Sequence, residues 1–316
     1  MKDKNMRGRL DFKIEVISSD DEKGILEVRL TPDPLRYNWE MVKGERFLYD
    51  KLDHVRIPMS VLKDAMKKSD PLPIYFQPPL LENVEEYIIK RIPHIKEELI
   101  GEFPKPTFED KSEDFLESLK KDELGFVILS LDMVNSTKIS TELPPDKFAK
   151  LISVLLYEIS NVIPLFHGHI LKYTGDGIIA YFPEPSFVSK NDLALDCSLT
   201  LIKMIYNGLN PILGSHDFPK IEIRIGLDSG DAIVVTMGSP ATKQHKDIIG
   251  SVVSLACKIQ STAEPGSINL GEATYQNLYI EWKSLCHKIN LPEGWKYESS
   301  EGIPYKIFTF TGKEHK

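Results

Sequence analysis

The sequence has few cysteines, no long hydrophobic run and no excess of positive charge. Its three cysteines, Cys197, Cys257 and Cys286, are an odd number without a CxxC pair. This pattern argues against a disulfide scaffold or a zinc site and favours a reducing compartment. No apolar run approaches the roughly 18 residues that span a bilayer, and the first residues hold no apolar signal core. We therefore expect a cytoplasmic protein without a membrane segment.

The charge balance narrows the possible partners. The 316 residues contain 39 Lys and Arg against 47 Asp and Glu, a formal net charge of -8. A protein that binds nucleic acid by neutralising its phosphate backbone needs the opposite sign, so we expect no nucleic-acid partner. A small nucleotide held through metal ions remains compatible with this charge. The length indicates two domains, or one domain with a large extension.

A polar segment with two prolines, residues 101–122, divides the chain. We place an accessory or regulatory domain at 1–110, a linker helix at 111–123 and a second domain at 124–316. In the first domain, alternation over 11–17 and 24–31 predicts a β-hairpin. Apolar spacing over 82–100 predicts a helix that Pro93 should kink or divide, because proline lacks the N–H that the helix needs.

The second domain alternates strand and helix patterns. Two apolar runs flank a Gly-Asp-Gly turn, which predicts a hairpin with Asp176 at its tip. The order β-α-β-β-α-β-β-α-β predicts an α+β fold with helices covering one face of the sheet. The expected elements are strand 126–132, helix 144–166, hairpin 169–182, helix 191–209, strands 220–227 and 232–237 linked by DSGD, helix 251–261 and strand 267–271.

Two acidic residues follow the pattern of a metal site. Asp132 ends the first strand, and Asp176 lies at the tip of the hairpin. A parallel neighbour pairing would place both at the same edge of the sheet, where they could share one or two Mg²⁺ or Mn²⁺ ions. Such hard cations take oxygen ligands and bind triphosphates at the same time, and the backbone carbonyl of Met133 could add a ligand. A turn residue or a helix N-cap is the alternative reading for each acid.

Polar residues beside these acids suit phosphate binding. Asn135, Ser136 and Thr137 precede a helix, and their N–H groups could cradle phosphate oxygens; N-capping by Asn135 or Ser136 is compatible with this. Lys172 lies four residues before Asp176, on the same face of the strand. A solvated outward orientation is the alternative for this lysine.

A second group of polar residues lies near the next helix. Asp247 precedes Ile-Ile-Gly and the helix 251–261. Ser254 and Lys258 are four positions apart, so they share a helix face. Lys258 could pair with a phosphate, and Ser254 could donate to a ribose or phosphate oxygen; both positions also suit an ordinary exposed helix face.

Taken together, the stretch from about 125 to 280 resembles the class III nucleotidyl cyclase catalytic domain, the adenylate and guanylate cyclase family. The segments that carry the resemblance, in the family's order and spacing, are LSLDMVNSTKIS, LKYTGDGIIAYF, IRIGLDSGDAIVV and DIIGSVVSLACKIQSTAEPGSINLGEATYQNL. The resemblance implies a ferredoxin-like βαββαβ core with an antiparallel or mixed sheet covered by helices. The rest of the chain would add a small N-terminal α+β accessory domain.

The resemblance also implies roles. Asp132 and Asp176 fall on the two aspartates that hold two Mg²⁺ or Mn²⁺ ions. Lys172 and Asp247 fall on the base-recognising pair, and a Lys and Asp there go with adenine in the family.

Three positions depart from the family pattern. Ser254 stands in place of the transition-state Asn, and Lys258 in place of the transition-state Arg, where it keeps the charge but loses the bidentate fork. Asp231 stands where some members carry an Arg that contacts phosphate.

The implied reaction converts a nucleoside triphosphate into a 3′,5′-cyclic nucleotide and pyrophosphate, a second-messenger synthesis. In the family the sites lie at a dimer interface, which implies a homodimer. Three readings remain open: an ATP-using cyclase, which the Lys172 and Asp247 pair favours; a pyrimidine cyclase that makes cyclic UMP or CMP in anti-phage defence; and a degenerate domain that binds nucleotide as a sensor.

Overall fold

The computed structural model describes residues 10–20, 25–68, 78–101, 115–117, 123–183, 190–299 and 302–312. The chain separates into two compact units. The first comprises residues 1–74 together with 278–284, and the second comprises 75–277 together with 285–316. The helix predicted at 111–123 lies largely outside the described residues, although 115–117 are helical.

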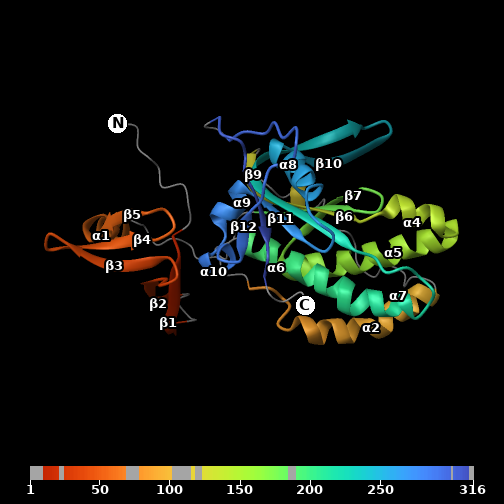
Figure 1. Cartoon of the computed structure of the whole chain (residues 1–316), viewed down its shortest axis with the longest axis horizontal. Coiled ribbons are helices and arrows are strands. Elements are labelled where there is room, and N and C mark those ends of the chain that lie inside the picture. The colour runs from red at the N-terminus through yellow and green to blue at the C-terminus, as the bar shows by residue number, and fades with distance from the viewer. Residues whose placement is uncertain are drawn as a thin grey trace. The chain divides into compact units, whose positions relative to one another are not determined.

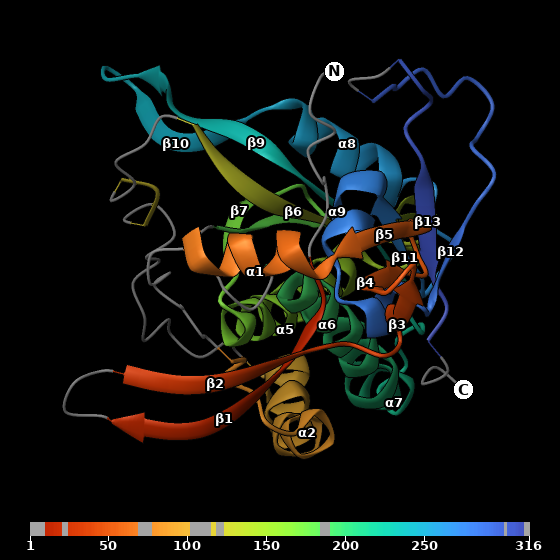
Figure 2. The same ribbon diagram turned by 90° about the vertical axis from the view of Figure 1, so that its left-hand side faces the viewer.

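The first unit contains two small antiparallel sheets. Strands β1 (Phe12–Asp20) and β2 (Ile25–Pro32) form the hairpin that the alternating pattern predicts. Strands β3 (Tyr37–Val42), β4 (Glu45–Asp50) and β5 (Val55–Pro58) form the second sheet, and helix α1 (Met59–Lys68) packs on β4 and β5 (Figure 2). The small core of this unit consists of Tyr37, Leu48 and Ile57 with Leu62 against them.

A buried arginine organises this first unit. The guanidinium of Arg36 donates to Asp11 at 2.8 Å, to Asp50 at 2.9 Å and to Asp53 at 2.8 Å. A buried charge is tolerated only when it is paired and hydrogen-bonded in this way. The hydroxyl of Tyr279 donates to the buried Asp33, which ties the segment of helix α10 (Ile280–Lys283) to this unit.

The second unit is built on an eight-stranded sheet (Figure 1). The strand order is β12-β13-β11-β9-β6-β8-β7, with β10 paired to β9. All pairings are antiparallel except that of β9 with β11, so the sheet is mixed, as expected for the α+β class. The strands are β6 (Glu123–Met133), β7 (His169–Tyr173), β8 (Ile178–Phe182), β9 (Ile223–Ser239), β10 (Lys243–Ile249), β11 (Ile268–Gly271), β12 (Cys286–Lys288) and β13 (Ile307–Phe310).

Helices cover both faces of this sheet rather than the single face that the sequence pattern predicted. Figure 1 shows α8 on one side of the sheet and α5 and α6 on the other, and all contact its central region or one another. The helices are α4 (Ser136–Glu142), α5 (Pro145–Val162), α6 (Lys190–Lys203), a π-helical segment (Met204–Leu209), α7 (Asn210–Gly214), α8 (Ser251–Gln260) and α9 (Glu272–Asn277).

Helix α2 (Val84–Ile100) belongs to the second unit, although its sequence lies in the stretch assigned to the accessory domain. It packs on α5 and on the π-helical segment, with Ile88 and Ile95 buried. The helix continues through Pro93, so of the predicted kink or division the division does not occur. Ile88 before the proline and Ile95 after it both lie beside Gly208 of the π-helical segment. Arg91 ion-pairs with the buried Glu158 of α5 and with Glu98, which fixes this contact further.

Strand β9 is one continuous strand, whereas the sequence predicted two strands separated by a DSGD turn. Ser229 and Gly230 of that segment pair with Val127 and Phe126 of β6, so the apparent turn lies within the sheet. At Gly226 a Cβ would lie 2.3 Å from the backbone nitrogen of Gln260, so only glycine lets α8 lie directly on β9. Strand β10, which carries Asp247, was not predicted because its first residues are polar.

The helical stretch Pro145–Phe166 is long and apolar enough to cross a membrane by length and composition alone. Its buried positions include Leu151, Leu155 and Ile159, which recur at helical spacing. Glu158 in the same stretch is buried and paired with Arg91. This is the pattern of a core helix, and the helix packs against α2, α4 and α6.

Asp228 in the core of the second unit should make stability depend on pH. Burial raises the pKa of Asp228 to about 7, although the hydroxyl of Tyr305 donates to it at 2.7 Å. Between about pH 4 and pH 7 the folded state binds a proton that the unfolded state releases, so stability falls as pH rises across that interval. From pH 5 to pH 7 the loss is about 2 kcal/mol. Asp228→Asn should flatten this slope in thermal unfolding; an unchanged slope would contradict the assignment.

Candidate active site

Asp132 and Asp176 lie at the same edge of the sheet. Asp132 is near the end of β6, and Asp176 lies in the turn between β7 and β8. The sequence predicted this proximity through a parallel pairing, and that pairing is wrong. Strand β8 runs antiparallel to β6, with Leu131 opposite Ile178, so the end of β6 meets the start of β8.

Glycines of the hairpin make this approach possible. A Cβ at Gly177 would lie 2.4 Å from the carbonyl oxygen of Leu131 and 3.3 Å from Cα of Asp132. Gly175 has φ +95°, a conformation that favours glycine. The Gly-Asp-Gly turn therefore places Asp176 beside the end of β6, where a larger residue at position 177 would push the hairpin away.

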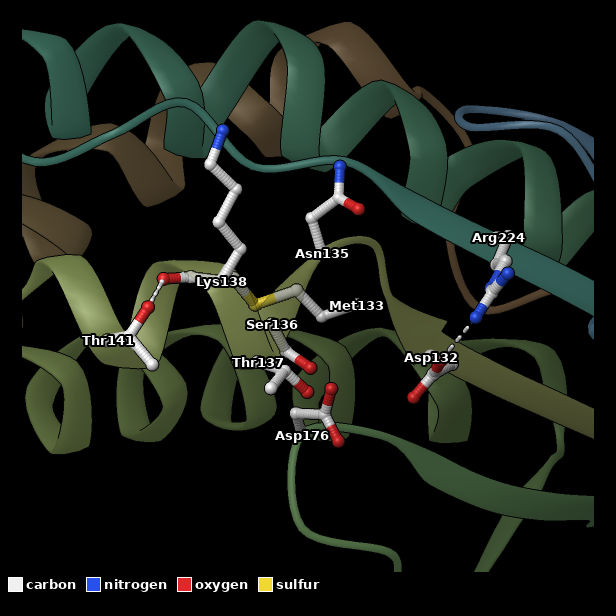
Figure 3. A pocket seen from close by; sticks show the side chains of 9 residues that line it. All are labelled: Asp132, Met133, Asn135, Ser136, Thr137, Lys138, Thr141, Asp176 and Arg224. Atoms are coloured by element: carbon white, nitrogen blue, oxygen red, sulfur yellow. Dashed lines mark hydrogen bonds and ion pairs between the residues drawn. The ribbon is translucent and has the colours of Figure 1, made fainter.

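The two acids line one pocket with a volume of about 810 Å³. Figure 3 shows the carboxylate of Asp176 next to Ser136 and Thr137, and Arg224 reaching toward Asp132 from β9. Besides the two acids, the pocket is lined by Met133, Asn135, Ser136, Thr137, Lys138, Thr141 and Arg224. Four predicted site residues therefore line the pocket together with the two acids: Met133, Asn135, Ser136 and Thr137.

The two carboxylates differ in their surroundings. Asp132 accepts from Nη2 of Arg224 at 3.1 Å through one oxygen, Oδ2. The carboxylate of Asp176 makes no hydrogen bond or ion pair with another residue of the described part of the chain. Sequence reasoning missed Arg224, because only the register of β6 against β9 shows that this residue lies opposite Asp132.

Asn135 shapes the loop after β6. It has a left-handed backbone with φ 56° and ψ 26°, and it occupies the N-cap of α4 without a side-chain capping bond. Asn tolerates this conformation better than most residues. The side chain of Asn135 therefore does not cap α4. Ser136 and Thr137 begin α4, and a phosphate-binding role for their N–H groups stays a prediction.

Lys172 and Asp247 form a second polar cluster. Nζ of Lys172 donates to Oδ2 of Asp247 at 2.6 Å, across 75 positions of sequence. Asp247 is 9% exposed and Lys172 41% exposed, so the acid is buried while part of the lysine reaches solvent. Because β7 is an edge strand, Lys172 does not lie on a central strand. Neither residue lines the pocket of Asp132 and Asp176.

The remaining predicted residues stand apart from the acid pocket. Ser254 and Lys258 are exposed on α8, and neither lines that pocket. Asp231 is also exposed and lies opposite Gly125, near the other end of β6 from Asp132. The acids and their neighbours thus form one group, Lys172 and Asp247 form a second, and the other three residues lie outside the acid pocket.

Comparison with known proteins decides the family. Residues 120–294, more than half of the chain, match the family model of the adenylate and guanylate cyclase catalytic domain. The chain belongs to this family. Its relatives include a cytidylate cyclase of Escherichia coli, 24% identical over 208 residues, which cover 63% of this chain and 43% of the relative. A uridylate cyclase of Rhodovulum sp. is 28% identical over 148 residues, covering 45% and 60% of the two chains.

Solved cyclase structures share the fold of the second unit. The adenylyl cyclase CyaB from P. aeruginosa matches with a TM-score of 0.53 and 23% identity, covering 62% of this chain and 98% of that one. The guanylate cyclase domain of RhGC from Catenaria anguillulae, solved with GTP, matches with a TM-score of 0.51 and 22% identity, covering 61% and 99%. The predicted cyclase fold is confirmed. The chain spans less than half the length of the E. coli cytidylate cyclase.

Proposed function

We propose that this chain is a metal-dependent nucleotidyl cyclase that converts a nucleoside triphosphate, with ATP favoured, into the 3′,5′-cyclic nucleotide and pyrophosphate. The observation that carries the proposal is the meeting of Asp132 and Asp176 in one pocket of a cyclase-family domain. The product would act as a second messenger. The chain would work in the cytoplasm, with the first unit as an accessory or regulatory module.

The donor set in the pocket fits hard divalent cations. Two carboxylates and the backbone carbonyl of Met133 are oxygen ligands, which Mg²⁺ and Mn²⁺ prefer. The described residues hold no group of three or more His, Cys, Asp and Glu side chains that could bind a metal alone. This agrees with the usual Mg²⁺ site, which one or two carboxylates complete with water and substrate phosphates. We propose that Asp132, Asp176 and Met133 hold two Mg²⁺ or Mn²⁺ ions.

The reaction is an internal phosphoryl transfer. The ribose 3′-oxygen loses its proton and forms a bond to the α-phosphorus, while the bond from that phosphorus to pyrophosphate breaks. The bound ions would supply charge neutralisation and a lower pKa for the 3′-hydroxyl. N–H groups of Asn135, Ser136 and Thr137 would orient phosphate oxygens, Lys258 would offset charge on the α-phosphate, and Ser254 would donate to ribose or phosphate.

The separation of the two polar groups supports a homodimer. Lys172 and Asp247 lie outside the acid pocket, so one chain supplies a metal half-site and a base half-site that do not form one pocket. A second copy of the chain would complete each site, with acids from one subunit and the base-reading pair from the other. The β9–β10 hairpin exposes three apolar side chains: Ile233, Ile249, which lies opposite it, and Met237. These side chains are suited to burial in such an interface.

The Lys172 and Asp247 pair favours adenine. Lysine donates and carboxylate accepts, which matches the ring N1 acceptor and the 6-amino donor of adenine. Cytosine presents an equivalent pattern, a ring-nitrogen acceptor beside an amino donor. This equivalence, together with the E. coli relative, makes a pyrimidine cyclase with a role in anti-phage defence the second candidate.

Product analysis with four nucleotides tests the base assignment. Purified protein is incubated with Mn²⁺ and each of ATP, GTP, CTP and UTP, and the products are identified by mass. We expect cyclic AMP as the main product. Cyclic CMP or cyclic UMP as the main product would replace the first candidate by the second. No product from any nucleotide, while a control cyclase is active, would favour a nucleotide-binding sensor.

Asp247→Ala should relax base choice more than it disturbs metal binding. The substitution removes the acceptor for the amino group and leaves Lys172 without its 2.6 Å partner. We expect kcat/KM for the preferred nucleotide to fall by about 10- to 100-fold relative to the others, since each good base contact is worth about 1–3 kcal/mol. Competition assays between paired nucleotides measure this ratio. An unchanged ratio would place base recognition elsewhere.

A further inference from the structure

Arg224 is the one cationic side chain that contacts a candidate metal ligand in the described part of the pocket. Its residue pairs directly with Asp132 across β6 and β9, so the side chains project from the same face of the sheet. Nη2 of Arg224 lies 3.1 Å from Oδ2 of Asp132. Figure 3 marks this contact between Arg224 and Asp132 with a dashed line.

The contact occupies only part of each group. Asp132 uses Oδ2, and no other hydrogen bond or ion pair joins its carboxylate to a described side chain. Nε of Arg224 is buried and lacks a hydrogen-bond partner among the described residues. Asp132 is therefore the only ion-pair partner that Arg224 has among the described residues.

The charges in the pocket are balanced without a metal. Asp132 and Asp176 contribute two negative charges, and Arg224 and Lys138 contribute two positive charges. Lys138 approaches Glu142 on its own helix at 3.7 Å, so its charge is directed partly away from the acids. Arg224, in contrast, acts directly on Asp132.

We propose that Arg224 is a positioning residue that serves as an internal counter-ion for Asp132, and that a divalent cation must compete with it for this carboxylate. The ion pair holds the Asp132 side chain toward the pocket before the metal arrives, and it lowers the affinity of the empty site for cations. This inference rests on the proposed function, because it requires Asp132 to be a metal ligand.

If Arg224 competes with the metal for Asp132, removal of its charge should raise the affinity of the pocket for Mn²⁺. Arg224 is 32% exposed and Asp132 31% exposed, so the pair is partly screened by solvent. Removing the guanidinium charge should therefore tighten Mn²⁺ binding by about two- to fivefold, the range of a partly exposed ion pair. Turnover should fall at the same time, because Asp132 loses the contact that orients it. A merely structural role would lower thermal stability without tightening metal binding.

The test measures the affinity of the full chain for Mn²⁺ in the absence of nucleotide. The electron paramagnetic resonance signal of free Mn²⁺ gives the concentration of the unbound ion in the titration. Arg224→Met and Arg224→Gln remove the charge, and agreement between them guards against a folding defect of one variant. Lys138→Met is the matched control, since it removes one positive charge from the same pocket without touching Asp132. It should change the Mn²⁺ affinity by less than about 1.5-fold, because solvent screens its charge.

The outcomes separate this inference from the proposed function. Asp176→Asn should weaken Mn²⁺ binding; if it and Asp132→Asn both bind as the unmodified chain does, the metal assignment itself fails. If both weaken binding but Arg224→Met and Arg224→Gln bind Mn²⁺ equally well or more weakly than the unmodified chain, the role of Arg224 is wrong. An equal tightening by Lys138→Met would also overturn it, since general pocket charge would then explain the effect.

Discussion

Replacing Asp132 or Asp176 by asparagine should lower kcat for cyclic nucleotide formation by about a thousandfold or more. Each substitution removes one of the two carboxylates that line the pocket and leaves a neutral amide of the same shape. The pocket would then no longer hold the metal ions whose positive charge neutralises the triphosphate. The measurement is product formation at saturating nucleotide and Mn²⁺.

The two variants should remain folded, because both positions lie at the edge of the sheet beside open pocket volume. Asp217→Asn is a suitable control: Asp217 is an exposed aspartate outside the pocket with φ 57°, a conformation that asparagine accepts. It should retain full turnover and thermal stability. Near-normal activity in either pocket variant, with its unfolding temperature unchanged, would show that the metal assignment is wrong.

Mixing two variants with complementary defects should restore activity on the preferred nucleotide if sites are shared between subunits. One variant carries Asp132→Asn with Asp176→Asn, and the other carries Lys172→Ala with Asp247→Ala. Each homodimer lacks one half of both sites. A mixed dimer has one intact site, with acids from the second variant and the base pair from the first. With random assortment, half of the dimers are mixed and about a quarter of all sites recover.

The two variants are co-expressed with different affinity tags, and sequential purification isolates the mixed dimer. The mixed dimer then does not have to form by subunit exchange between purified homodimers. The isolated mixed dimer should show about half of the activity of the unmodified dimer. An inactive mixed dimer, or full activity in a strictly monomeric unmodified chain, would contradict the shared-site arrangement.

Local sequence signals predicted the elements that depend on local chemistry. The Gly-Asp-Gly turn gave rise to the β7–β8 hairpin, and the apolar spacing of Leu151, Leu155 and Ile159 to α5. The DSGD segment misled the same reasoning, since turn-forming residues inside β9 are held in the sheet by their pairing with β6. Helix α2 likewise stays continuous at Pro93, where it packs on α5 and the π-helical segment. In both places, packing outweighed local preference.

The candidate site divides in the same way. The common sheet edge of Asp132 and Asp176 could be predicted, although through the wrong pairing, because Asp132 lies near the end of a strand and Asp176 in a hairpin turn with a clear local pattern. The contact of Lys172 with Asp247 joins positions 75 apart, and that of Arg224 with Asp132 joins positions 92 apart. Such contacts depend on strand order and register, which local periodicity does not contain. The role of Arg224 could therefore be proposed only from the folded chain.

The stoichiometry of the products tests the central claim most directly. The unmodified chain is incubated with its preferred nucleoside triphosphate and Mn²⁺, and cyclic nucleotide and pyrophosphate are quantified in the same sample. The cyclase assignment predicts equal amounts of the two, with both absent for Asp132→Asn and Asp176→Asn. Release of a linear nucleotide with phosphate or pyrophosphate, and no cyclic product, would mean that the chain hydrolyses triphosphates and is not a cyclase.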